Sequence, residues 1–251
     1  MKPRISVITP SFNAAKTIDR AIQSVLAQKY SNVQHLIIDG GSTDGTFNII
    51  QKYQHIKWVS ERDQGQADAM NKGFELSNGE LIVYLNADDE FAPGVFDKVA
   101  SFYQSSGSSN KFMLVMDLKV REANGMAWTA VPSLKFSDIA DPAKMLFPYN
   151  PLSYFYHRKL QESVGKFPLD LRYAMDYWFL LRAYKLADMR YESFEAGTFY
   201  NFSNKTSDKQ RSESECLQVL IAFYKKTLPI VFLLHPNVIR AKRMMGQLKK
   251  L

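Results

Sequence analysis

Short apolar runs alternate with amphipathic segments through the first hundred residues. The apolar runs are rich in β-branched and aromatic residues, which favours strands; they are RISVIT (4–9), QHLIID (34–39), IKWVS (56–60) and ELIVYL (80–85). The amphipathic segments repeat apolar residues with the period of a helix; they are 18–26, 46–53 and 66–76. This alternation predicts a parallel sheet with crossover helices, the pattern of an α/β protein.

The elements follow a less regular order after Phe91. The pattern predicts a helix over 94–104, a hairpin from 112–120 and 125–131, a helix over 175–187 and strands over 189–202. The polar stretch 203–214 is expected to be a mobile segment, either a lid over a bound ligand or an ordinary solvated loop. The rest of the chain is expected to be helical and basic.

Composition indicates a globular protein with a substantial core. The chain has 251 residues, of which 46% are hydrophobic and 23% charged. Its single cysteine, Cys216, cannot form an internal disulfide, and the four scattered histidines have no metal-ligand spacing. His157 is the histidine nearest to the acidic segment of the second half. The N-terminal apolar stretch is broken at Pro10, so it predicts a strand rather than a signal peptide, and we expect a cytoplasmic protein.

The net charge of +7 is concentrated in the last 36 residues. Seven of the 32 basic residues and no acidic residue lie in 216–251, which leaves 25 basic residues against 25 acidic ones in the rest of the chain. Apolar residues adjoin basic ones over 228–251, a pattern that suits a helix on an anionic membrane surface. A helix packed on the body with a solvated basic face fits equally well. Nucleic-acid binding is disfavoured because no aromatic platform or known motif accompanies the charge.

Candidate chemistry gathers where the predicted strands end. The stretch LNADDEF (85–91) places Asp88 and Asp89 directly after an apolar strand, where unpaired charges cost several kcal/mol. A divalent cation would compensate them, because Mg²⁺ and Mn²⁺ take carboxylate oxygens together with substrate phosphates. Alternatively, both side chains cap a turn or the next helix. Ligands of open α/β sheets sit at this edge.

Two nucleotide-binding motifs are missing at that edge. The stretch GGSTDGT (40–46) lacks the lysine of a P-loop, and no G-x-G-x-x-G occurs, so nucleotide hydrolysis and dinucleotide reduction are poorly supported. Asp39, at the end of its strand, either contacts a ligand or forms an Asx-turn. Gly65 and Gly73 are expected to serve the backbone.

Taken together, four stretches resemble the family 2 glycosyltransferases, which are inverting, use nucleotide sugars and have the glycosyltransferase-A fold. The stretches are ITPSFN (8–13), IIDGGSTDGT (37–46), ERDQGQADAMNKG (61–73) and LNADDEF (85–91). The resemblance covers about residues 4–202. It implies a Rossmann-like, mostly parallel central sheet flanked by helices, with a C-terminal helical extension.

The resemblance also implies a domain organisation. Residues 1–205 would form the catalytic domain, with a nucleotide-sugar-binding half (1–105) and an acceptor-side half (106–205). A mobile loop and a basic helical tail (206–251) would follow it.

The resemblance further implies roles for individual residues. Asp88 would bind Mn²⁺ or Mg²⁺, Asn86 stands where the family's D-x-D pattern has its first aspartate, and Asp39 would accept the N3 hydrogen of uracil. The other expected nucleotide contacts are Thr9, Pro10, Ser11, Asn13, Asp63, Asp68 and Asn71. Asp176, in LRYAMDYWFLLR (171–182), would be the catalytic base, with Met175 where the family often has a second acid.

The expected function is therefore a metal-dependent glycosyltransferase of the hexosyltransferase type. It would transfer a sugar, most simply from a UDP-sugar, to a saccharide or polyprenyl-linked acceptor in cell-surface polysaccharide synthesis, in the cytoplasm or at the inner face of the cell membrane. One alternative is a sugar nucleotidyltransferase, although the loop after the first strand lacks that class's glycine- and arginine-rich pattern. Another alternative is a non-catalytic nucleotide-sugar-binding protein docked on a membrane.

Overall fold

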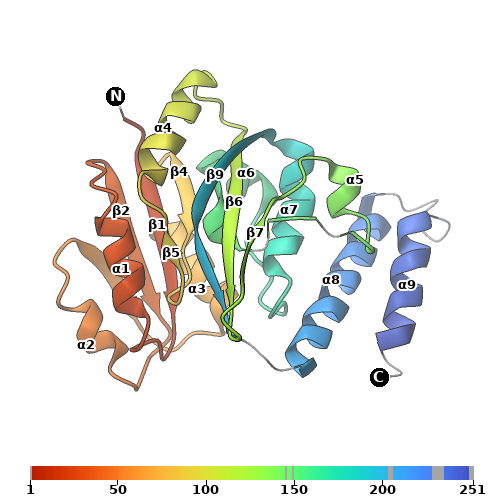
Figure 1. Ribbon diagram of the computed structural model, residues 1–251, viewed down its shortest axis with the longest axis horizontal. Coiled ribbons are helices and arrows are strands. Elements are labelled where there is room, and N and C mark those ends of the chain that lie inside the picture. The colour runs from red at the N-terminus through yellow and green to blue at the C-terminus, as the bar shows by residue number, and fades with distance from the viewer. Residues whose placement is uncertain (1, 145, 149, 203–205, 228–234, 249–251) are drawn as a thin grey trace.

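The computed structural model describes residues 2–144, 146–148, 150–202, 206–227 and 235–248. The strands are β1 (Ile5–Ser11), β2 (Val33–Asp39), β3 (Ile56–Ser60), β4 (Leu81–Tyr84), β5 (Glu90–Phe91), β6 (Phe112–Glu122), β7 (Ala127–Ala130), β8 (Tyr154–His157) and β9 (Asp188–Asn201). The α-helices are α1 (Ile18–Leu26), α2 (Thr46–Ile50), α3 (Gln66–Leu76), α4 (Val95–Ser105), α5 (Phe136–Ile139), α6 (Arg158–Val164), α7 (Met175–Leu186), α8 (Thr206–Thr227) and α9 (Pro236–Leu248). Within these residues the strands form one sheet with helices on both faces (Figure 1).

Four parallel strands form the first half of the sheet, in the order β3-β2-β1-β4. On β1, Ile5 and Val7 join a buried cluster with α1 and α4, whereas Ile8 joins a cluster with α3 on the opposite face. This alternation follows from the two-residue period of a strand. The predicted α/β architecture is confirmed in this half, and all four predicted strands are present.

The second half of the sheet is mixed. β8 is antiparallel to both β4 and β6, β9 is parallel to β6, and β5 and β7 are antiparallel to their neighbours. The parallel arrangement expected for most of the sheet is therefore concentrated in the first half. The predicted strands over 189–202 form one long strand, β9 (Asp188–Asn201), and the short buried strand β8 was absent from the predicted elements because its four residues, YFYH, carry no clear period.

Two glycines allow α3 to lie where it does. Gly65 precedes the helix with φ +110°, a left-handed conformation that L side chains rarely adopt. Gly73 faces β1 so closely that an added Cβ would lie 2.3 Å from Cγ2 of Ile8. Both glycines thus serve the backbone, as expected from the sequence.

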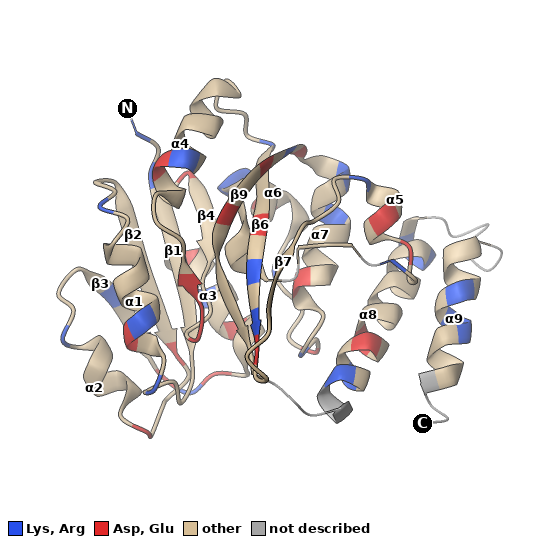
Figure 2. Ribbon diagram, in the orientation of Figure 1, with Lys and Arg blue, Asp and Glu red and all other residues tan. Residues whose placement is uncertain are grey.

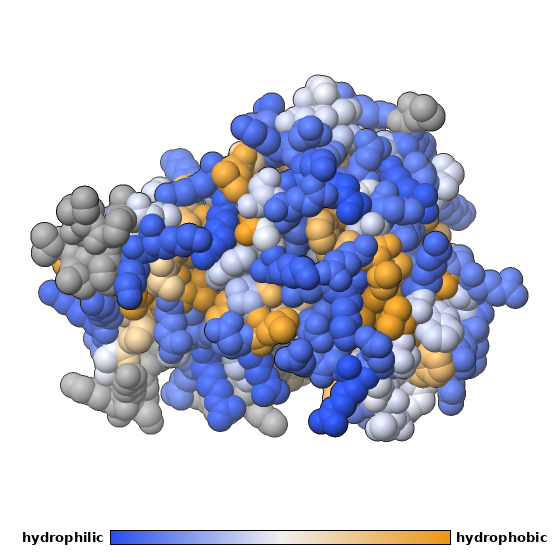
Figure 3. All heavy atoms as spheres, turned by 180° about the vertical axis from the view of Figure 1, so that it is seen from behind, coloured by the Kyte–Doolittle hydropathy of each residue, from blue (hydrophilic) through white to orange (hydrophobic). Residues whose placement is uncertain are grey.

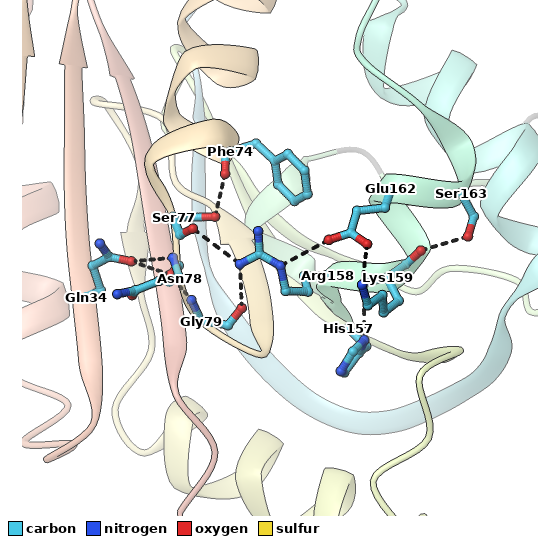
Figure 4. Close-up of polar contacts among 11 residues, drawn as sticks. Gln34, Phe74, Ser77, Asn78, Gly79, His157, Arg158, Lys159, Glu162 and Ser163 are labelled. Atoms are coloured by element: carbon cyan, nitrogen blue, oxygen red, sulfur yellow. Dashed lines mark hydrogen bonds and ion pairs between the residues drawn. The ribbon is translucent and has the colours of Figure 1, made fainter.

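Arg158 connects the two halves at the amino ends of the parallel strands (Figure 4). Its guanidinium donates to the carbonyl oxygens of Ser77 and Gly79, both at 3.2 Å, and its Nε lies 3.3 Å from a carboxylate oxygen of Glu162. The neighbouring His157 accepts a hydrogen bond from the backbone N–H of Lys159 through Nδ1 and so caps α6. His157 therefore has a structural role in this fold.

The C-terminal helices pack against the body. Leu217, Leu220 and Phe223 of α8, together with Val238 and Ala241 of α9, belong to the same buried cluster as α7. The expected mobile segment is corrected for 206–214, which form the first part of α8; 203–205 lie outside the described residues. The helix forms because apolar residues recur along the α8 face that meets α7.

The exposed side of α9 is basic. Arg240, Lys242 and Arg243 are exposed, and the helix carries no acidic residue (Figure 2). No helix among the described residues is long and apolar enough to span a bilayer. From behind, hydrophobic residues appear as separate patches among hydrophilic ones (Figure 3).

Candidate active site

A large pocket of about 1290 Å³ opens at the carboxyl ends of the parallel strands. Its walls come from the loops after β1, β2, β3 and β4, from the start of α3, from the segment 169–175 and from β9. The polar or charged side chains on its walls are Ser11, Asn13, Lys16, Thr17, Asp44, Arg62, Asp63, Gln64, Gln66, Asn86, Asp88, Asp170, Arg172 and Tyr173. The pocket therefore lies where parallel α/β sheets bind ligands.

The adjacent aspartates after β4 have opposite environments. Asp88 is exposed on the pocket wall, whereas Asp89 is completely buried. The Asp89 carboxylate accepts hydrogen bonds from the side-chain amides of Asn86 (3.0 Å) and Asn150 (2.7 Å) and from the backbone N–H of Tyr200 (3.1 Å). Burial, and then the charge of Asp88, raises the pKa of Asp89 to about 7. Donors within the protein thus hold Asp89, although they offset its burial only in part, and Asp88 is the carboxylate that is open to the pocket.

The surroundings of Asp88 suit a divalent cation. Although its side chain reaches solvent, the surrounding protein removes enough water to raise the pKa of Asp88, and the nearby Arg20 only partly opposes this. Arg20 donates its hydrogen bond to the backbone oxygen of Asp88 and stacks on the ring of Tyr200. No ion pair involves the Asp88 carboxylate in the described part of the chain.

The protein supplies few ligands for such a cation. Asn86 also lines the pocket, but its amide oxygen already accepts from Gln66 and its amide nitrogen donates to Asp89. Residues 2–144, 146–148, 150–202, 206–227 and 235–248 contain no cluster of three or more His, Cys, Asp or Glu side chains suited to a metal. One carboxylate fits a Mg²⁺ or Mn²⁺ ion whose remaining ligands are phosphate oxygens and water.

Several of the predicted nucleotide contacts lie on the pocket wall. Pro10 and Ser11 end β1, Asn13 follows it, and Asp63 follows β3. The hydroxyl of Ser11 is buried and has no hydrogen-bond partner among the described residues, so a bound ligand can supply one. Asn13 adopts φ 50° and accepts from the backbone N–H of Thr43, which fixes the loop after β1 against the loop after β2.

Thr9 and Asp39 do not line the pocket, and their expected contacts with the nucleotide stay predictions. The Thr9 hydroxyl is completely buried and lies 3.0 Å from Nε2 of His35. The Asp39 carboxylate, 1% exposed, accepts from the backbone N–H and hydroxyl of Ser42 and from the hydroxyl of Ser60 at 2.7 Å. Asp39 thus holds the turn after β2 through Ser42, three residues on, whereas an Asx-turn would bond the backbone two residues on; base recognition by Asp39 stays a prediction.

Asp68 and Asn71 do not line the pocket either, and each is bonded to other groups of the protein. Asp68 accepts from the backbone N–H of Gln64 and pairs with Lys72 at 3.4 Å. The amide of Asn71 makes two hydrogen bonds of 2.9 Å with the backbone of Phe167. Asn71 therefore joins α3 to the acceptor-side segment, and its amide oxygen and nitrogen are already occupied.

Asp176 is the second residue of α7; it does not line the pocket itself but is next to the pocket-lining Met175. Burial raises the pKa of Asp176 to about 6. The buried hydroxyl of Tyr154 donates to its carboxylate at 3.4 Å, which lowers that pKa slightly. A carboxylate with a pKa near 6 is ionised at neutral pH and is still basic enough to accept a proton.

The sequence analysis missed other residues that the fold brings to the pocket. Phe12 is 65% exposed, although aromatic side chains are usually buried, and it lines the pocket beside Ser11. Lys16, Arg62 and Arg172 line it as well and bring positive charge to a wall that also carries four aspartates. Phe12 lies within the stretch ITPSFN (8–13), and that place could have indicated it, but the cations come from loops that only the fold brings together.

Comparison with known proteins identifies the family. Residues 6–114 match the model of glycosyl transferase family 2. An uncharacterised glycosyltransferase from Mycobacterium tuberculosis (strain CDC 1551 / Oshkosh) is 31% identical over 186 residues, which cover 72% of this chain and 69% of that protein. A putative teichuronic acid biosynthesis glycosyltransferase, TuaG, from Bacillus subtilis (strain 168) is 34% identical over 117 residues, or 44% of this chain and 46% of that protein.

Some curated relatives are much longer than the matched region. An uncharacterised glycosyltransferase from Nostoc sp. is 38% identical over 108 residues. The matched region covers 41% of this chain but only 34% of that protein. This chain thus matches about half or less of the Nostoc and Bacillus relatives.

Solved structures confirm the predicted glycosyltransferase-A fold. A TarS fragment from S. aureus in complex with UDP-GlcNAc has a TM-score of 0.67 at 19% identity, over 88% of this chain and 66% of that one. A mannosyltransferase from Pyrobaculum calidifontis in complex with GDP-Man and Mn²⁺ has a TM-score of 0.65 at 18% identity, over 98% of this chain and 70% of that one. The relative from Mycobacterium tuberculosis, which is 31% identical and matched over 69% of its length, shows that the chain belongs to glycosyl transferase family 2.

Proposed function

We propose that this protein is an inverting glycosyltransferase that moves a sugar from a nucleotide donor, a UDP-sugar, to a saccharide acceptor. The observation that carries the proposal is the pocket at the strand ends, which has Asp88 on one wall and the helix of Asp176 beside another. Asp88 is exposed on the pocket wall, whereas Asp176 lies in the first turn of α7 with a pKa raised by burial, so the two carboxylates are suited to two different tasks.

The donor is proposed to lie against the loops after β1 and β3. The exposed ring of Phe12 offers a flat surface for a nucleobase, and the Ser11 hydroxyl offers an unused hydrogen-bonding group. Lys16 and Arg62 are cations on the same wall, and they favour the charge of a diphosphate. Related structures solved with UDP, UDP-GlcNAc and GDP-Man support a nucleotide-sugar donor.

Asp88 would hold a Mg²⁺ or Mn²⁺ ion, with the Asn86 amide beside it. When bound, the ion neutralises negative charge on the diphosphate leaving group. The related mannosyltransferase solved with Mn²⁺ supports metal use in this fold.

Asp176 is proposed as the general base. The acceptor hydroxyl oxygen attacks the anomeric carbon, its proton passes to the Asp176 carboxylate, and the bond from that carbon to the diphosphate oxygen breaks with its electron pair leaving on the nucleotide. Attack from the face opposite the nucleotide inverts the anomeric configuration. A base of this kind typically contributes about 10²- to 10⁴-fold to the rate.

The acceptor is proposed to be a saccharide, free or polyprenyl-linked, in cell-surface polysaccharide synthesis. Curated relatives named for teichuronic acid biosynthesis and for PGL/p-HBAD biosynthesis support this proposal. The exposed basic residues of α9 support a cytoplasmic protein that touches the inner face of the membrane peripherally. The catalytic unit is proposed as 1–205 and the basic extension as 206–251.

A thermal-shift screen tests the donor. UDP and GDP, each with and without Mn²⁺, are compared, because a ligand that binds the native state raises its apparent stability. We expect the largest shift with UDP and Mn²⁺ together. A larger thermal shift with GDP would replace uracil by guanine as the nucleobase of the proposed donor. No shift with any nucleotide would contradict the proposal.

A further inference from the structure

The helix that carries Asp176 begins without a cap of its own. The residue at its N-cap position is Ala174, whose side chain has no hydrogen-bonding atom. The N–H groups at a helix start have no partners within the helix, and leaving them unsatisfied is costly where water is excluded. The N–H of Ala174 is one of these groups, and those of Arg172 and Tyr173 precede the helix and lie in no strand, so all three need an acceptor from elsewhere in the fold.

Glu215 of α8 supplies that acceptor from 41 residues further along the chain. Its carboxylate accepts three consecutive backbone N–H groups, those of Arg172 (3.0 Å), Tyr173 (2.5 Å) and Ala174 (2.6 Å). A carboxylate also interacts favourably with the positive end of the helix dipole. One side chain thus fixes the backbone at the entrance to α7.

The backbone that Glu215 holds is also a wall of the pocket. Leu169, Asp170, Leu171, Arg172 and Tyr173 all line it, and Asp176 follows two residues after the last of the three bonded N–H groups. A shift of the segment 169–174 would move the acceptor-side wall and the proposed base together, while the walls after β1 and β3 would stay in place.

We infer that Glu215 is a positioning residue that holds the acceptor-side wall and Asp176 in register with the donor. The inference rests on the proposed function for its kinetic consequence, but the contact itself can be tested without any activity. Glu215 acts through the backbone of 172–174 and is not itself a group that accepts the proton. An error of about 1 Å in such positioning is enough to cost about 10²-fold in rate.

Amide hydrogen exchange tests the contact directly. The variants are Glu215→Ala, Glu215→Gln, which keeps the shape and one acceptor oxygen, and the control Glu213→Ala, an exposed position on the same helix. We expect exchange at Arg172, Tyr173 and Ala174 to rise about tenfold or more in Glu215→Ala, as loss of hydrogen bonds to a charged group predicts. The exchange rates of these three amides in Glu215→Gln should lie between those of the wild type and of Glu215→Ala. In Glu213→Ala they should match the wild type. Unchanged exchange at these three amides in Glu215→Ala would overturn the inference.

Kinetics separate positioning from a general loss of stability. In Glu215→Ala, kcat should fall and the KM for the acceptor should rise, while the thermal shift produced by UDP and Mn²⁺ stays within about twofold of the wild-type shift. If donor binding and kcat fell equally, the role of Glu215 as a positioning residue would be contradicted. If Glu215→Ala does not fold, Glu215→Gln carries both measurements. If the wild type transfers no sugar, the proposed function fails and the exchange result still decides the role of Glu215.

Discussion

The two ends of the parallel strands are built on opposite principles. At the amino ends, the guanidinium of Arg158 is matched by two carbonyl oxygens and a carboxylate, so its charge is satisfied within the protein. At the carboxyl ends, Asp88 and the Ser11 hydroxyl face the pocket without such partners among the described residues. The comparison teaches that one end contributes stability, whereas the other keeps groups available for a ligand.

The largest effect on the pocket side of this comparison is expected from Asp176→Asn. The amide has nearly the shape of the carboxylate but cannot accept the proton, so we expect transfer to fall by about 10²- to 10⁴-fold. Donor binding, measured as the thermal shift with UDP and Mn²⁺, should be nearly unchanged. Substantial transfer by the variant would remove Asp176 as the base.

Asp88→Asn and Asp89→Asn sharpen the contrast between neighbours. Asp88→Asn should remove the part of the UDP thermal shift that depends on Mn²⁺ and lower transfer by about 10²-fold or more, because charge stabilisation by a metal is worth several kcal/mol. Its melting temperature without ligand should change little.

Asp89→Asn should have the reverse effect on stability. An asparagine cannot accept from Asn86, Asn150 and Tyr200 all at once, so at least one donor is left unpaired, at a cost of about 1–3 kcal/mol of unfolding free energy. Denaturant unfolding measures this change. If Asp88→Asn proves the more destabilising of the two, the contrast fails.

Arg158→Ala tests the opposite end of the strands. It removes two hydrogen bonds to carbonyl oxygens, and we expect the free energy of unfolding to fall by about 1–3 kcal/mol. Transfer per folded molecule should remain at the wild-type level, because the site lies at the other end of the sheet. Arg158→Lys should be intermediate, since an ammonium lacks the planar fork of donors. A specific loss of kcat in the folded variant would break the comparison.

Tyr154→Phe is expected to have the smallest effect. The Tyr154 hydroxyl stabilises the ionised form of Asp176, so its removal should raise the pKa of Asp176 further above about 6. Transfer needs the ionised base, which is lost as the pH falls through that pKa. The acid limb of the kcat profile, near pH 6 in the wild type, should therefore move to higher pH by a fraction of a unit. A limb that moves to lower pH would contradict this hydrogen bond.

The sequence was sufficient for the parallel half of the fold. The periods of its strands and helices are local properties of the chain, because every second residue of a strand and every third or fourth residue of a helix faces the core. The ends of these strands carry Ser11, Asp63 and Asp88, and the rule that ligands bind at such ends located the pocket.

Only the tertiary structure decided which polar groups are free. Asp88 and Asp89 are neighbours of the same type, and what distinguishes them is that Asn150 and Tyr200, distant in sequence, turn toward Asp89 alone. In the same way the amide of Asn71 is occupied by Phe167, and the backbone N–H of Ala174, just before α7, is bound by Glu215. A sequence pattern records what a side chain can do. The partners that arrive from elsewhere in the fold determine whether its charge or hydrogen-bonding capacity is already used, because burial without a partner is what makes a polar group costly.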